Sequence, residues 1–345
     1  MRRIAPTEPA ALTMSTGSTT NAAPPSPPPA TPIPHTDPPP RIVRASEQGG
    51  RLGLRGYIEH LRWLFAHFPL VLSLARTQLK LTVSRSRLYY LWWMLDPVLD
   101  TACYAVLFAL LRAGTAAGLD TVPTVAFLLA GIVPWRMNAA CWSASGQMWQ
   151  ANRAILEQVR FPHLVLPLAR FLSESWLYAV ALGVLVAACV LFGVTPSWTW
   201  LLLPLWVCVQ GLMVLAFMPV FAIGSAFSLD FLKLLPYLLR LVFFFSPVLY
   251  GLIPLVPDWL RPWMYLNPMT MLMETYRAIL FHGYTRMPAV LNEAGDVITP
   301  AVVWTLPSLQ SVVVYVFALV AVLLTTSYAF IRLQPTMSRN VSRMY

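Results

Sequence analysis

Long runs of apolar residues dominate the chain and alternate with short polar segments. A helix needs about 20 mostly apolar residues to cross the hydrocarbon core of a bilayer, and several of these runs reach that length. We therefore predict an all-α integral membrane protein with six transmembrane helices. The predicted spans cover residues 88–111, 122–147, 166–192, 198–229, 231–251 and 306–333.

The segment at 51–88, before the first predicted span, has an amphipathic pattern instead. Apolar side chains recur there at mixed spacings of three and four, with basic side chains between them, and Pro69 would interrupt a helix. This pattern predicts a broken helical region that lies along the membrane surface and faces anionic lipid. The apolar positions are Tyr57, Leu61, Leu64, Phe65, Phe68, Leu72, Leu79 and Val83, and the basic positions are Arg55, Arg62, Arg76, Lys80, Arg85 and Arg87.

Residues 252–284, between the fifth and sixth predicted spans, are apolar but interrupted by prolines. The segment is too broken for one span and too apolar for a free loop. It predicts short re-entrant or interfacial helices whose irregular backbone is buried in protein. We consider it a candidate gate at the outer side of the membrane, with a static cap as the alternative. The gate candidates are Pro254, Pro257, Trp259, Asn267, Pro268 and Arg277.

The N-terminal 50 residues are rich in proline and poor in large apolar side chains. Such a segment has little to bury and predicts a disordered cytoplasmic tail, with a docking motif as the alternative. It lacks the apolar stretch of a secretory signal peptide. The predicted organisation is a tail at 1–50, an interface region at 51–88, a transmembrane domain at 89–335 and a cytoplasmic tail at 336–345.

Composition and charge exclude a soluble fold. Hydrophobic residues make up 57% of the chain and charged residues 11%, against roughly 25% charged in ordinary globular proteins. The net charge of +10 does not indicate nucleic acid as a partner, because the basic residues flank apolar runs. Nine of them fall in residues 41–87, which predicts that both termini lie in the cytoplasm.

The four cysteines lie in apolar stretches without metal-binding spacing, and we interpret them as small core residues.

The sequence contains no Gly-x-x-x-x-Gly-Lys-Ser/Thr loop for nucleotide phosphates. Its acidic residues form no metal-binding cluster, and its five histidines are scattered. We therefore predict that the chain is not an enzyme and holds no cofactor. If the chain moves a substrate uphill, the energy must come from a partner chain.

Four motifs occur in order along the predicted spans. They are Leu91-Trp92-Trp93-Met94-Leu95-Asp96-Pro97, then Leu128-Leu129-Ala130-Gly131-Ile132-Val133-Pro134-Trp135, then residues 152–167 with Phe161-Pro162 and Leu166-Pro167, and last Ser246-Pro247-Val248-Leu249-Tyr250 with Asn267-Pro268 and Tyr276-Arg277 before Gly283. In this order and at these topological places, they resemble the type-2 ABC export permeases for O-antigen, capsule and teichoic acid polymers. The resemblance covers roughly residues 57–335. The proline-rich N-terminus and Arg136 depart from the family pattern.

The resemblance implies a homodimer of this chain around one pathway and a pair of ATPase subunits, which hold ATP and Mg²⁺, on the cytoplasmic face. Residues 151–159 are compatible with a helix that begins at a capping Asn152 and stops at Phe161-Pro162. We expect a coupling helix in a groove of the ATPase, with a plain linker as the alternative. The coupling candidates are Asn152, Arg153, Leu156, Glu157, Phe161 and Pro162.

Charged residues inside predicted spans are rare and therefore candidates for function. Asp96 and Asp100 lie four residues apart on the first span, and Asp96 is explained as a helix cap before a proline. Asp100 and Arg136 lie about 18 and 17 Å from the cytoplasmic ends of their spans, at 1.5 Å per residue. We predict that they pair near the midplane, for structure or for contact with sugar hydroxyls. Arg170 and Glu174 predict a local ion pair.

Aromatic side chains are candidates for the substrate path, because a sliding polysaccharide needs many weak stacking contacts. The alternative is that these residues form the aromatic belts of the membrane interfaces. The path candidates are Trp92, Trp93, Tyr104, Trp135, Trp142 and Tyr250.

Taken with the resemblance, these features predict a permease subunit that exports a lipid-linked polysaccharide across the bacterial inner membrane. A permease for drugs or small lipids would share the spans. A membrane-embedded glycosyltransferase is a weaker alternative, because its chemistry needs catalytic carboxylates on a large outer loop. A secondary carrier would show more spans or internal repeats, and the sequence has neither.

Overall fold

The computed structural model describes residues 54–84, 91, 95, 98–99, 102–103, 106, 124–152, 162–287, 290–291, 297–299 and 302–344. The predicted tail at 1–50 and most of the predicted first span lie outside these residues.

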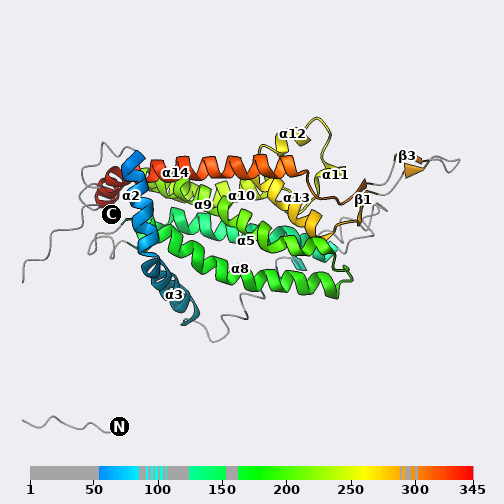
Figure 1. Cartoon of the computed structure of the whole chain (residues 1–345), viewed down its shortest axis with the longest axis horizontal. Helices are drawn as coiled ribbons and strands as arrows, with labels where there is room; N and C mark the ends of the chain where they lie inside the picture. Colours follow the sequence, from blue (N-terminus) through cyan, green and yellow to red (C-terminus); the bar gives the residue numbers. More distant parts are fainter. Residues whose placement is uncertain are drawn as a thin grey trace, which may run out of the picture. The chain divides into compact units, whose positions relative to one another are not determined.

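Long apolar helices form the body of the protein and run side by side (Figure 1). They are α5 (Thr124–Gly146), α8 (Val165–Leu191), η1 (Trp198–Leu202) continuing into α9 (Leu203–Phe227), and α14 (Leu309–Met344). Within the described residues, these are the four helices long and apolar enough to cross a membrane. They match the second, third, fourth and last predicted spans to within three residues at every end except one. The exception is α14, which continues past residue 333 to Met344.

Helix α10 (Leu229–Phe245) corresponds to the fifth predicted span but is shorter than expected. Its 17 residues extend about 25 Å, less than the roughly 30 Å of a hydrocarbon core. Ser228 separates α9 from α10, and its side chain accepts hydrogen bonds from the amides of Asp230 and Phe231. The helix ends because Ser246 is extended and Pro247 follows. The count of six spans therefore stays a prediction, and the bound at residue 251 was wrong for this helix.

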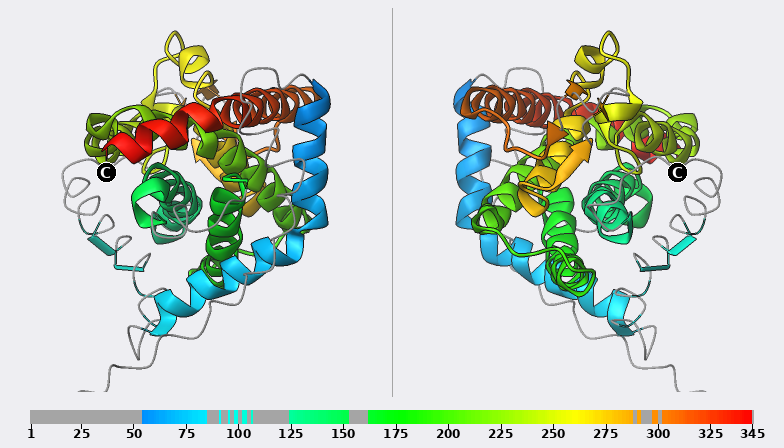
Figure 2. Two further views of the ribbon diagram at one scale, coloured as in Figure 1. Left: turned by 90° about the vertical axis from the view of Figure 1, so that its left-hand side faces the viewer. Right: turned by 90° about the vertical axis from the view of Figure 1, so that its right-hand side faces the viewer.

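The amphipathic region folds into α2 (Leu54–Ala66) and α3 (Phe68–Ser84), which run crosswise to the long helices at one end of the bundle (Figure 2). The break falls at His67, close to Pro69 as predicted. The hydroxyl of Tyr57 on α2 lies 2.8 Å from that of Ser327 on α14. On the other side, Ser173 of α8 donates to the carbonyl of Ala75 on α3. We call this the α2 end of the bundle.

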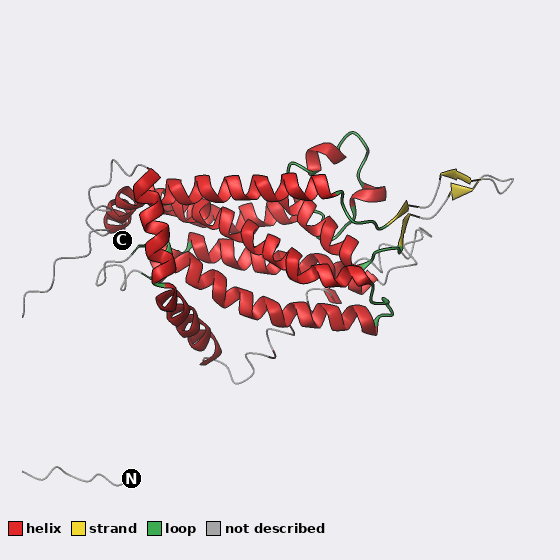
Figure 3. Ribbon diagram, in the orientation of Figure 1, coloured by secondary structure: helices red, strands yellow, loops and turns green. Residues whose placement is uncertain are grey.

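The opposite end carries the short elements (Figure 3). The proline-rich segment contains α11 (Leu252–Leu255), α12 (Arg261–Met264) and α13 (Pro268–Leu280). Four short strands follow, β1 (Thr285–Met287), β2 (Val290–Leu291), β3 (Val297–Thr299) and β4 (Val302–Val303). They form two antiparallel pairs, β1 with β4 and β2 with β3. The all-α prediction is correct for the membrane-spanning part, but it missed these strands, which are too short to show a period in the sequence.

Helix α5 lies against α8, α9, α10 and α13 and is the most buried of the long helices. A short helix, α6 (Met148–Ala151), follows α5. Three side chains on one face of α5 and α6 donate hydrogen bonds to α9. The donors are Trp142, Ser145 and Trp149, and the acceptors are the carbonyls of Val214, Met218 and Ala222. The acceptors recur every four residues, so one face of α5 and α6 is fixed in register along α9.

Candidate functional site

A cavity of about 820 Å³ lies among α5, α8 and α10 and contains three charged side chains. They are Arg136 on α5, Glu174 on α8 and Arg240 on α10. Arg136 and Arg240 lie about 18 and 17 Å along their helices from the first residue, so both are near the middle of the bundle. Sequence analysis singled out Arg136 and missed Arg240. The signal was there, because a lone base in an apolar run is unusual. The remaining lining residues are Ile132, Val133, Trp135, Met137, Ala139, Ala140, Tyr178, Ala181, Leu239, Phe243 and Phe244.

Glu174 is buried, and two arginines act on its carboxylate. It forms the predicted ion pair with Arg170, four residues before it on α8. The guanidinium of Arg136 also acts electrostatically on the Glu174 carboxylate. The predicted partner of Arg136, Asp100, lies outside the described residues, so that pair stays a prediction. Glu174 had been assigned only to its local pair, because the contact with α5 depends on how the two helices face each other.

A chain of buried hydrogen bonds connects the cavity to α13. The hydroxyl of Tyr178, which lines the cavity, donates to that of Tyr276 over 3.0 Å. Tyr276 donates to the side-chain oxygen of Gln210 over 2.6 Å, and the amide of Gln210 donates to the carbonyl of Pro134. Four elements, α8, α13, α9 and α5, are joined in this way. A movement of α13 would therefore displace Tyr178 at the cavity wall.

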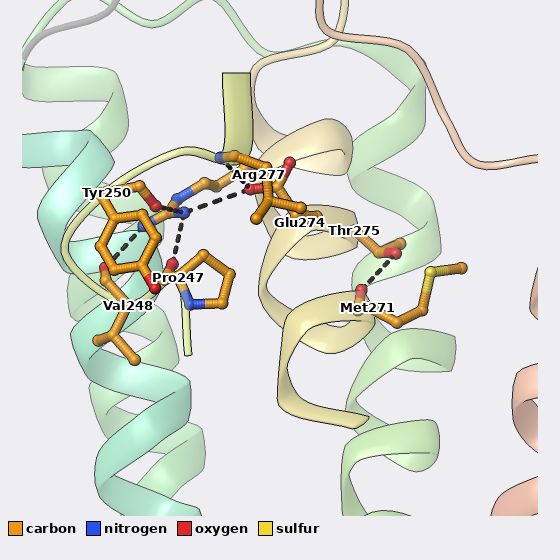
Figure 4. A network of polar contacts seen from close by, with 8 residues as sticks. Pro247, Val248, Tyr250, Met271, Glu274, Thr275 and Arg277 are labelled. Carbon is orange, nitrogen blue, oxygen red and sulfur yellow. Dashed lines mark hydrogen bonds and ion pairs between the residues drawn. The ribbon is translucent and has the colours of Figure 1, made fainter. Parts of the chain in front are cut away.

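Arg277 fastens α13 to the irregular segment after α10 (Figure 4). Its side chain is completely buried. One guanidinium nitrogen donates to the carbonyls of Pro247 and Tyr250 over 2.6 and 2.7 Å, and another donates to that of Val248 over 2.6 Å. The charge is balanced by Glu274 at 3.7 Å. Segment 246–250 is not helical, so no helix amides donate to these carbonyls. The guanidinium of Arg277 supplies the hydrogen-bond donors instead.

Two further contacts complete the surroundings of Arg277. Its guanidinium carbon lies 3.9 Å from the ring centre of Phe127 on α5, in a cation–π contact. Gly131, one turn further along α5, allows the backbone at Val248 to approach. A β-carbon at Gly131 would overlap the carbonyl oxygen of Val248 and lie 2.9 Å from a guanidinium nitrogen of Arg277.

The other gate candidates occupy distinct places. Asn267 caps α13 by accepting from the amide of Met269, and its own amide donates to the hydroxyl of Ser246 over 2.8 Å. Pro268 follows as the first residue of the helix. Pro257 and Trp259 are exposed, and Pro254 lies in α11.

The aromatic path candidates separate into different environments. Trp135 lines the cavity and contacts Phe243 edge-on, with ring centres 5.4 Å apart. Trp142 does not line it, because its ring is buried in the core between α5 and α9. Tyr250 is half-buried and donates to the carbonyl of Phe244. Trp92, Trp93 and Tyr104 lie outside the described residues, as does Asp96.

Two of the coupling candidates, Asn152 and Pro162, are described, and both lie at the α2 end. Asn152 ends α6, and its backbone and side-chain amides both donate to the carbonyl of Met148. The predicted helix at 151–159 lies mostly outside the described residues, so it stays a prediction. Pro162 is buried just before α8. Arg153, Leu156, Glu157 and Phe161 lie outside the described residues. The described part of the chain contains no group of three His, Cys, Asp or Glu side chains that could hold a metal ion.

The burial of His163, at the α2 end, predicts how the stability of the protein depends on pH. Burial lowers the pKa of His163 to about 4, so the folded protein keeps this ring neutral where an unfolded chain, with a pKa near 6.5, would take up a proton. Stability is therefore lost as the pH falls from about 6.5 toward 4. Between pH 7 and pH 5 the expected loss through His163 is about 2 kcal/mol of unfolding free energy.

The measurement is thermal unfolding in detergent at pH 7 and pH 5. His163→Phe should reduce the difference between the two pH values, whereas His67→Gln, at an exposed position, should preserve it. Burial lowers the pKa of His60 too, so a residual acid sensitivity of the same sign is expected. An unchanged difference in His163→Phe would contradict the assignment.

Together, the long apolar helices, the amphipathic pair across one end and the charged cavity between the spans define a multi-pass membrane protein of the transporter type. A family model described as ABC-2 type transporter matches residues 69–281, more than half of the chain. The chain belongs to this family of membrane transporter permeases.

Curated relatives agree with this assignment. The chain is 29% identical over 226 residues to the O-antigen export system permease protein RfbA of Myxococcus xanthus, which covers 65% of this chain and 85% of the relative. It is 26% identical over 220 residues to a protein of the same name from Klebsiella pneumoniae, covering 63% and 82%. The resemblance found in the sequence motifs is confirmed.

Proposed function

We propose that this chain is the membrane-spanning subunit of an ATP-driven exporter that moves a lipid-linked polysaccharide across the inner (cytoplasmic) membrane of a bacterium. Family membership supports a transport role, and the relatives named for O-antigen export support a polysaccharide as cargo. The sequence has no phosphate-binding loop, which favours a separate ATPase chain that binds ATP and Mg²⁺.

In the proposed assembly, two copies of this chain surround one pathway and two ATPase subunits bind at the cytoplasmic face. In this proposal the α2 end faces the cytoplasm, since it carries the basic amphipathic helices, and both termini are on that side of the membrane. Six spans would then include the segment at 88–111 and α10. The exposed apolar stripe of α10, formed by Leu234, Tyr237, Leu241 and Phe244, supports a contact with the second copy.

Arg240 is the observation that carries the proposal. It is exposed and lies about 17 Å along α10, where the residues from Leu234 to Phe245 are otherwise uncharged and almost all apolar. A guanidinium at that depth is costly in hydrocarbon, so water or a polar substrate must reach it. Arg240 shares its cavity with Arg136, Glu174 and the ring of Trp135, a combination suited to hydroxyl-rich and aromatic-stacking ligands. We infer that the translocation path runs along this face of α10.

Helix α13 supports a re-entrant element beside the path. At 13 residues it is about 20 Å long, too short to cross a bilayer, yet its residues from Met269 to Leu280 are all buried. Irregular backbone at membrane depth is tolerated only where protein satisfies it, which is what Arg277 does for residues 247–250. The proposed role of α11 to α13 is a gate at the outer side.

Co-reconstitution with the ATPase in liposomes tests the proposal. With a lipid-linked glycan supplied as cargo, Arg240→Gln is expected to lower the rate of export about tenfold, equivalent to about 1.4 kcal/mol. Lys233→Gln is the matched control, because Lys233 is an exposed base on the same helix that pairs with Asp230. This control should export at the rate of the unaltered protein.

Three results separate the alternatives. Export at full rate by Arg240→Gln would place the path elsewhere. ATP hydrolysis that amphiphilic drugs stimulate and glycans do not would favour a permease for drugs or small lipids. Glycan transfer without ATP would favour a membrane-embedded glycosyltransferase.

A further inference from the structure

Both ends of the segment that joins α6 to α8 are held in one buried aromatic cluster. Trp149 on α6 and His163, just before α8, meet edge-on with ring centres 5.3 Å apart. Trp149 also stacks on Phe330 of α14, with centres 6.3 Å apart and planes at 18°. Its indole N–H donates to the carbonyl of Ala222 on α9 over 2.8 Å. The ends of this segment are therefore fixed to each other and to two long helices.

The last turns of α14 belong to the same cluster. The helix has 36 residues and is about 54 Å long, well beyond the roughly 30 Å needed to cross a bilayer. Pro335 lies inside it, and the turns that follow lie across the end of the bundle (Figure 2). Met337 is completely buried and Val341 nearly so, in a cluster with Trp149, Phe330 and neighbouring residues of α8 and α9.

The outward face of the same turns is polar and basic, with Arg332, Thr336 and Arg339 exposed. A helix with one buried apolar face and one exposed polar face is typical of an element that packs on protein and meets water. The end of α14 therefore shares one buried cluster with Trp149 of α6 and with Leu166 at the start of α8.

We propose that Trp149, His163, Phe330 and Met337 form a clamp that transmits the motion of the ATPase from segment 152–162 to α8, α9 and α14. The clamp rests on the proposed function, in which the ATPase acts on that segment. A push on a loop with free ends is absorbed by local rearrangement. When the ends are fixed by close-packed aromatic contacts, the displacement passes to the attached helices, because packed interiors transmit strain. The four residues are positioning residues, since none of them contacts the substrate.

The first test needs no partner and uses amide hydrogen exchange of the full-length permease in detergent. Truncation after Thr336 removes Met337 and Val341 without altering the membrane-crossing part of α14. The clamp predicts that exchange of the α6 amides and of Val165 and Leu166 rises at least tenfold, although these residues are far from the truncation in sequence. Unchanged exchange at these amides would overturn the proposal whether or not the chain is an exporter.

The second test measures glycan exported per ATP hydrolysed in proteoliposomes that contain the ATPase. Phe330→Ala and His163→Ala should lower this ratio about tenfold while the complex still assembles and hydrolyses ATP. His163→Phe should restore the ratio, because it keeps an aromatic edge against Trp149. Trp149→Phe, which removes the hydrogen bond to Ala222 but keeps a smaller aromatic ring in the cluster, should have a smaller effect than Trp149→Ala. It also gives a usable variant where Trp149→Ala fails to fold.

Trp176→Ala is the control, because this tryptophan of α8 is exposed and lies outside the cluster. A purely structural role would lower assembly, hydrolysis and export together and leave the ratio constant, which would overturn the clamp. If the unaltered protein exports no glycan, the proposed function fails, and the hydrogen-exchange result still decides whether the clamp exists.

Discussion

Replacing Arg277 by leucine is expected to remove most of the yield of folded protein. The variant would leave the carbonyls of Pro247, Val248 and Tyr250 buried without donors and Glu274 without its positive partner. Removing one member of a buried ion pair costs about 3–5 kcal/mol, and each orphaned acceptor adds to that. Since this approaches the total stability of many proteins, we expect little monodisperse protein.

Size-exclusion chromatography of the detergent extract and the thermal midpoint measure this effect. Arg277→Lys should be intermediate, since an ammonium group keeps the charge but cannot place donors in the planar geometry of a guanidinium. Arg261→Leu is the control, because Arg261 pairs with the highly exposed Asp258 in the same proline-rich segment. Such a pair is worth at most about 1 kcal/mol. Normal yield of Arg277→Leu would contradict the role of this arginine.

Gly131→Ala is expected to have the next largest effect on folding, although it adds a single methyl group. The new β-carbon would overlap the carbonyl oxygen of Val248, which is backbone and cannot rotate away. The segment at 247–250 would have to move, and the 2.6 Å bond from Arg277 to Val248 would be lost with it. We expect a destabilisation of about 3 kcal/mol, since overpacking alone costs about 1–3 kcal/mol.

Gly183→Ala provides the matched comparison. This glycine lies inside α8, and no atom lies within 4 Å of a β-carbon placed there. Alanine should stabilise the helix at this position by up to about 1 kcal/mol. Because Gly131 and Arg277 act on the same carbonyl, the double variant Gly131→Ala with Arg277→Lys should cost less than the sum of the two single changes. Strict additivity, or equal melting of the two glycine variants, would refute the close approach.

Much of the fold follows from composition along the chain. The second, third and fourth predicted spans agree with α5, α8 and η1 with α9 to within a few residues, and the break at Ser228 lies two residues before the predicted boundary at residue 230. The interruption of the amphipathic region near Pro69 was also predicted correctly. These features depend on local properties, namely the length of an apolar run, a proline or a serine cap.

The candidate site was predictable only in part. The sequence analysis named Arg136, Trp135, Asn267 and Arg277 as candidates, but it named no partner for the last three. The partner it predicted for Arg136, Asp100, lies outside the described residues. Trp135 and Trp142 looked equivalent in the sequence, yet one lines the cavity and the other is buried in the core. The helical period indicates which residues share one face of a helix. It does not indicate which neighbouring helix, cavity or lipid that face contacts.

The sequence by itself determined that this protein is embedded in a membrane and where most of the described membrane helices begin and end. The reason is that a bilayer imposes a length and an apolar composition on each helix separately. Only the tertiary structure decided that Arg277 holds residues 247–250, that Gly131 admits this backbone, and that Glu174 serves two arginines. Each of these contacts joins different helices or distant segments, and their pairing depends on how the helices are rotated and packed.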